Sequence, residues 1–115
     1  MGDAEISQDE FYCSKSVVRV EWWLHDCDLP DRLTWARVRV FSDGSADACF
    51  GEQATLYGFR DEDNAGYLLS EDEYVRLSSL DELDKKPYGV AWASPIPPRW
   101  SEQANQRFEY RGTHP

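Results

Sequence analysis

Two runs of alternating apolar and polar residues, joined by a short turn sequence, dominate residues 35–50. Alternation around a turn that contains Gly44 predicts a β-hairpin. A two-residue turn would place Val40 opposite Asp47 and mix core and solvent positions on one face. A three-residue loop, Ser42-Asp43-Gly44, with Gly44 in the left-handed conformation, places Val40 opposite Ala46 instead. We therefore predict the three-residue loop. The other pairs in this register are Phe41 with Ser45, Val38 with Ala48, Ala36 with Phe50, and Arg39 with Asp47.

Similar alternation outside the hairpin predicts further strands. Residues 16–25 place four apolar side chains on one face and half-polar side chains on the other, as expected in an antiparallel sheet. The apolar face carries Val18, Val20, Trp22 and Leu24. Residues 54–59 and 88–93 predict two more strands, and a short ordered piece is expected around Phe108 and Tyr110. The chain thus predicts an antiparallel sheet of four or five strands.

Residues 61–83 change to helical spacing. Three acids at the start of this segment complement the positive end of a helix. Gly66 weakens the first part by about 1 kcal/mol relative to alanine. Ser70 followed by Glu73 has the pattern of a capping box, which predicts a second helical piece. We predict an α+β fold in which this helical region covers one face of the sheet.

The length of 115 residues is typical of one domain, and we assign residues 1–115 to it. Residues 1–15 are predicted to be a loose acidic leader, ordered at most near Phe11 and Tyr12, and residues 101–115 a partly ordered tail. The first residues are polar, unlike a signal peptide, and no apolar run reaches the roughly 20 residues needed to cross a bilayer. Together with three cysteines lacking paired spacing, these features favour a reducing, cytoplasmic location.

The charge of the chain is strongly negative and unevenly distributed. The formal net charge of −10 disfavours nucleic acids and anionic membranes as partners. Residues 61–84 hold nine acids against Arg76 alone. Such clustered carboxylates either form a solvated helix surface or attract a protein partner with a basic surface. The predicted partner-binding residues are Asp61, Glu62, Asp63, Glu71, Asp72, Glu73, Asp81, Glu82 and Asp84.

No catalytic residue, metal site or cofactor is predicted. Residues 61–72 partly match a calcium loop, but Ala65 stands where an oxygen ligand belongs, and the final bidentate Glu is replaced by Asp72. Cys27 lies between two aspartates, which disfavour the reactive thiolate. A zinc site formed by His25 and Cys13, Cys27 and Cys49 lacks the usual paired spacing. The proline-rich residues 95–98 are predicted to pack inside the molecule, with Trp92 or Trp100 on the sheet.

Two other functions remain open at this point. A small enzyme or ligand-binding domain would have an aromatic pocket lined by Trp22, Trp35 and Tyr57. A structural homo-oligomer would bury an aromatic face formed by Trp23, Trp35 and Phe41. The sequence leaves the choice between monomer and homodimer open.

Two stretches carry a resemblance to known proteins. The first is Trp23-Leu24-His25-Asp26 together with residues 38–45, and the second consists of Tyr57-Gly58-Phe59, Glu62, Ala65, Leu68 and Glu71-Asp72-Glu73-Tyr74. Together they resemble short bacterial domains of unknown function, some of which are suspected immunity proteins of toxin systems. The resemblance covers residues 16–80 and implies a helix after the strands and a non-enzymatic, inhibitor-type protein. It transfers no catalytic residue. Gly66 departs from the helical part of the pattern.

Overall fold

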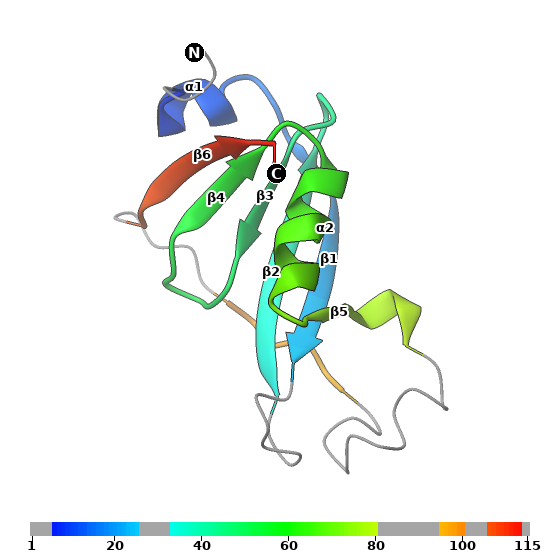
Figure 1. The fold of residues 1–115 in the computed structure, drawn as a ribbon. Helices are drawn as coiled ribbons and strands as arrows, with labels where there is room; N and C mark the ends of the chain where they lie inside the picture. The colour runs from blue at the N-terminus through cyan, green and yellow to red at the C-terminus, as the bar shows by residue number, and fades with distance from the viewer. Residues whose placement is uncertain (1–5, 26–32, 81–94, 101–105, 114–115) are drawn as a thin grey trace.

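The computed structural model describes residues 6–25, 33–80, 95–100 and 106–113, and these form an α+β fold with a six-stranded mixed sheet (Figure 1). The predicted strand at 88–93, and Trp92 within it, lie outside the described residues. The elements in chain order are α1 (Gln8–Tyr12), β1 (Val17–His25), β2 (Thr34–Phe41), β3 (Ala46–Cys49), β4 (Leu56–Phe59), α2 (Glu62–Glu71), β5 (Val75–Arg76), the 3₁₀-helix η2 (Leu77–Ser79) and β6 (Phe108–Gly112).

The strands are ordered β5-β1-β2-β3-β4-β6 across an open sheet. All neighbours are antiparallel except β4 and β6, which are parallel. The predicted α+β class is therefore confirmed, but the prediction of four or five strands, all antiparallel, is wrong. The two unexpected strands are short edge strands. β5 comes from the segment predicted as helix, and β6 comes from the segment predicted as tail.

The central hairpin has the predicted register. Val40 pairs with Ala46, Val38 with Ala48, and Arg39 with Asp47. The loop is closed by Phe41 N–H, which donates to Ser45 O at 2.8 Å, and Gly44 has a φ of +90°. A three-residue loop with glycine in the left-handed position is therefore confirmed, because it alone keeps the apolar residues on one face.

Helix α2 begins where the acids predict it but ends earlier than residue 83. Asp61 is its N-cap and accepts from Asn64 N–H at 3.0 Å. At the other end Glu73 has a φ of +66°, and its N–H donates to Ser70 O while Tyr74 N–H donates to Leu69 O. These two bonds form a Schellman motif, which ends the helix. The capping-box prediction at Ser70 is therefore wrong, because this serine belongs to the last turn of α2.

Helix α2 covers the half-polar face of β1, and not the face that carries Val18, Val20 and Trp22. Trp23 pairs with Ala36 and Glu21 with Val38, so this face of β1 continues the apolar face of the hairpin. The core beneath α2 consists of Trp23, Ala36, Val38, Val40, Ala46, Ala48, Phe59, Ala65 and Leu69. Val18 and Val20, predicted for the apolar face, are 62% and 44% exposed.

The opposite face of the sheet is covered in part by α1 and by residues 95–100. Phe11 of α1 is buried, and its ring lies 5.2 Å from the ring of Phe108 in β6 and 5.9 Å from that of Phe41 in β2. Trp100 packs edge-on against Trp22 at 5.0 Å. The predicted packing of Trp100 on the sheet is confirmed. Part of the predicted leader thus forms an ordered helix with a capping box between Ser7 and Glu10.

Candidate functional site

The outward side of α2 carries acids around an exposed tyrosine. Tyr67 is 57% exposed and makes no hydrogen bond or ring contact among the described residues. Asp63 and Glu71 lie four residues before and after it, so all three share one side of the helix. Asp72 and Glu73 follow at the exposed C-terminal end. We call these five residues the α2 acidic surface.

The nine acids predicted as partner-binding residues have different environments. Asp81, Glu82 and Asp84 lie outside the described residues. Asp61 is occupied as the N-cap of α2 and also accepts from Asn64 Nδ2 at 2.7 Å. Glu62 turns toward the sheet and joins an ion-pair network. The other four are exposed and belong to the α2 acidic surface.

Glu62 is bound by the protein's own arginines. The guanidinium of Arg19 in β1 donates to both carboxylate oxygens of Glu62 and also to Glu21, the last at 2.7 Å. Arg76 lies 3.7 Å from Glu62. The hydrogen bonds from Arg19 lower the pKa of Glu62. Glu62 therefore anchors α2 to the sheet and is not available to a basic partner.

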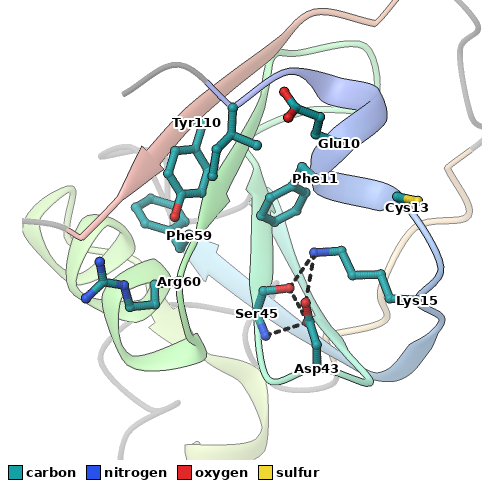
Figure 2. A pocket seen from close by; sticks show the side chains of 10 residues that line it. Glu10, Phe11, Cys13, Lys15, Asp43, Ser45, Phe59, Arg60 and Tyr110 are labelled. Atoms are coloured by element: carbon teal, nitrogen blue, oxygen red, sulfur yellow. Dashed lines mark hydrogen bonds and ion pairs between the residues drawn. The ribbon is translucent and has the colours of Figure 1, made fainter. Parts of the chain in front are cut away.

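A pocket of about 280 Å³ lies between α1, the β2–β3 loop and the ends of β4 and β6 (Figure 2). Aromatic rings from Phe11, Phe59 and Tyr110 line it, and Lys15 points toward its centre. Sequence reasoning did not identify this pocket, because its walls come from four segments far apart along the chain. No short motif marks such a pocket.

Three polar side chains of this pocket, Lys15, Asp43 and Ser45, are bound to one another. Lys15 Nζ donates to Ser45 Oγ at 2.7 Å, is 3.5 Å from an Asp43 oxygen, and lies 3.6 Å from the centroid of the Phe11 ring. Ser45 Oγ donates to Asp43 at 2.5 Å, and this bond lowers the pKa of Asp43. The Lys15 side chain is only 6% exposed. This cluster therefore fixes the loop against α1 and leaves few free groups to bind a ligand.

A second polar cluster is buried beneath α1. The hydroxyl of Tyr12 donates to Asp47 Oδ2 at 2.7 Å, and Arg39 donates to both oxygens of the same carboxylate. Asp47 is fully buried. Burial, followed by the charge of Asp47, raises the pKa of Tyr12. The hairpin register predicts the Arg39–Asp47 pair, but no sequence signal indicates Tyr12, which reaches it from 35 residues away.

The aromatic residues predicted for the two alternative functions are not brought together. Trp22 and Trp35 contact each other with ring centroids 6.1 Å apart. Tyr57 lies on the other face, because it pairs with Ala48 of the core beneath α2. These three residues therefore do not line one pocket. Of the residues predicted for an exposed aromatic face, Trp23 and Phe41 are buried.

Within residues 6–25, 33–80, 95–100 and 106–113, no group of three or more His, Cys, Asp or Glu residues is placed to hold a metal ion. The thiol of Cys49 donates to Gly51 O at 2.8 Å, and burial raises its pKa. None of the helices in this part of the chain is long and apolar enough to span a membrane.

Comparison with protein-family models, curated proteins and solved structures finds no match to this chain. In the pocket, Lys15, Asp43 and Ser45 are bound to one another, whereas the α2 acidic surface is exposed.

Proposed function

We propose that this protein is a non-enzymatic binding module that presents the α2 acidic surface to a protein partner with a basic surface. The observation that carries the proposal is Tyr67, 57% exposed between Asp63 and Glu71 on one side of α2. Tyrosine is enriched in protein interfaces, where its ring adds apolar contact area and its hydroxyl adds a hydrogen bond. Surrounding carboxylates attract a basic partner and orient it.

The internal ion pairs support this division of roles. Arg19 and Arg76 are committed to Glu62 on the inner side of the helix. Asp63, Asp72 and Glu73 have no ion pair within the described part of the chain. Their negative charge is therefore directed at solvent and is available to a partner. Residues 16–80 resemble short bacterial domains of unknown function, some of them suspected immunity proteins, so inhibition of a basic toxin is one specific form of the proposal.

The test combines affinity capture with a salt titration. The full chain, immobilised, is used to capture proteins from the source cells, and the captured partner is then titrated with purified protein at increasing salt. We expect affinity to fall by at least about tenfold between low and high ionic strength, because exposed charges are screened. Tyr67→Lys should weaken binding by a similar factor, since it removes the ring and adds a repelling charge.

Asp9→Lys is the matched control for Asp63→Lys. Asp9 is an exposed acid on α1, so its replacement changes the net charge equally but leaves the α2 acidic surface intact. Asp63→Lys should weaken binding of the partner, both as a single variant and when added to Tyr67→Lys. Asp9→Lys should leave the affinity unchanged. An affinity that is indifferent to salt and to both α2 variants would refute the proposal.

A further inference from the structure

The least protected part of the sheet is the N-terminal half of β1. Val17, Val18 and Val20 are 44%, 62% and 44% exposed, although they lie within four consecutive positions of one strand. Scattered apolar residues are normal on a protein surface, but three so close together on a strand form a patch. In the described residues, the other large hydrophobics with comparable exposure are Tyr67 and Ile96.

This stretch is also an edge of the sheet. β5 pairs with β1 only at Trp23 and Leu24. The helix η2 lies beside Glu21, because Ser78 Oγ donates to the Glu21 carboxylate at 3.2 Å. Figure 1 shows β5 beside the C-terminal end of β1 only. Among the described residues, no strand pairs with the outer side of residues 17–20. Such an edge can accept another strand.

The opposite edge of the sheet differs in chemistry. β6 carries Glu109 and Arg111, which lie two residues apart and therefore share one face of the strand. Their side chains form an ion pair at 2.5 Å. Charged side chains protect an edge strand against pairing. The single arginine in the exposed part of β1, Arg19, is instead turned toward Glu21 and Glu62. The valine edge therefore lacks the charged protection that β6 has.

We propose that this valine edge, residues 17–20 of β1, pairs with the same edge of a second copy of the chain. The edge is self-complementary: in an antiparallel pairing about a twofold axis at Arg19, Val18 lies opposite Val20 of the second copy, and the reverse pair is equivalent. The two arginines at the axis do not repel strongly, because each is already neutralised by Glu21 and Glu62. Each arginine also lies diagonal to Glu21 of the other copy.

The dimer is weak and depends on salt. The paired stretch is short, and an irregularity in register lies between Val17 and Arg19. An interface formed mainly by residues 17–20 of each copy is at the small end of protein–protein interfaces. Two copies that each carry a net charge of −10 also repel one another. Salt screens this repulsion, so self-association should strengthen as ionic strength rises, whereas binding of a basic partner to α2 should weaken.

Sedimentation equilibrium of the full chain, from about 10 µM to about 1 mM at low and high salt, tests the proposal. We expect a monomer–dimer equilibrium that is favoured by salt and weakened at least about tenfold by Val18→Lys, which places a charge on the edge. Tyr67→Lys is the matched control, because Tyr67 is 57% exposed, close to the 62% of Val18, and the charge change is the same. It should leave the dimer intact.

Two results would overturn this inference. One is a wild-type chain that stays monomeric at the highest concentration in high salt, which would leave the edge for an extended segment of a different protein. The other is a dimer that Val18→Lys and Tyr67→Lys weaken equally, which would place the contact elsewhere. Neither result bears on the basic partner, whose binding is measured with a separate probe and has the opposite salt dependence.

Discussion

Among single residues, Asp47 is a fully buried carboxylate, and burying a charge costs free energy unless other groups pair with it and hydrogen-bond to it. Arg39 supplies the opposite charge from the neighbouring strand, and Tyr12 supplies a hydroxyl from α1. Tyr12 therefore has two roles: it completes the hydrogen bonding of Asp47 and holds α1 against the sheet. Neighbouring rings, Phe11 at 4.9 Å and Phe41 at 5.6 Å, surround it.

We expect Tyr12→Phe to lower the free energy of unfolding by roughly 1–3 kcal/mol at neutral pH, because the buried Asp47 carboxylate loses one of the hydrogen bonds that satisfy its charge. The pKa of Tyr12 is raised in the folded protein, above the value of about 10 for an unfolded tyrosine. The folded chain then holds a proton that the unfolded chain releases. The stability that Tyr12 contributes is therefore present below about pH 10 and is lost as pH rises above it.

Urea unfolding at neutral pH and above about pH 10 measures both effects. The wild-type protein should lose more stability between the two pH values than Tyr12→Phe does. Tyr67→Phe is the control, since Tyr67 is exposed and its hydroxyl has no hydrogen-bond partner among the described residues. An equal loss in wild type and Tyr12→Phe would contradict the assignment.

At the scale of elements, two glycines have opposite roles although both interrupt regular patterns. Gly66 lies in the middle of α2, and a Cβ there would be 3.6 Å from Trp23, an ordinary contact distance. Gly44 lies in the hairpin loop with a φ of +90°, which other residues rarely adopt. The glycine in the helix is therefore a weakness, whereas the glycine in the loop is required.

Alanine at each position should show the difference. Gly66→Ala should raise the free energy of unfolding by roughly 0.5–1 kcal/mol, because alanine restricts the unfolded chain and favours the helix. Gly44→Ala should lower it by roughly 1 kcal/mol or more, because the left-handed conformation is strained for alanine. Thermal unfolding followed by circular dichroism measures both changes in stability. If both variants were stabilised or both destabilised, the role assigned to one of the two glycines would be contradicted.

At the scale of the whole molecule, three segments far apart along the chain meet on one face of the sheet. Gly58 of β4 lies beneath the rings of Phe11 and Phe108. Gln106 fixes the start of β6, because its Nε2 donates to Ala54 O at 2.7 Å and contacts the Cys49 sulfur at 3.2 Å. The N-terminal helix, the sheet and the C-terminal strand therefore form one packed unit.

Gly58→Ala should destabilise this unit by roughly 1–3 kcal/mol, because the added methyl group overpacks a filled site. Its Cβ would lie 2.8 Å from the Phe108 ring and 3.1 Å from the Phe11 ring. Gly51→Ala is the control, since the nearest atom there, Ala54 Cβ, is 3.7 Å away. Chemical denaturation compares the two variants. A Gly58→Ala protein as stable as Gly51→Ala would mean that the rings can move aside at little cost.

Local patterns along the chain were enough to predict the hairpin register and the start of α2. Alternation with period two and the conformation of Gly44 select one loop length, and the acids at residues 61–63 indicate where the helix begins. These features depend on residues within about ten positions of one another.

Contacts between distant segments settled the rest. The parallel pairing of β6 with β4 joins residues about 50 positions apart, and the choice of covered face on β1 depends on Trp23 meeting Ala36 and α2. Alternation shows that a strand has two faces but cannot show which one a helix will cover. The exposed valine edge and the ion pair that commits Glu62 to Arg19 emerge only after that choice, because burial and pairing are properties of the assembled sheet.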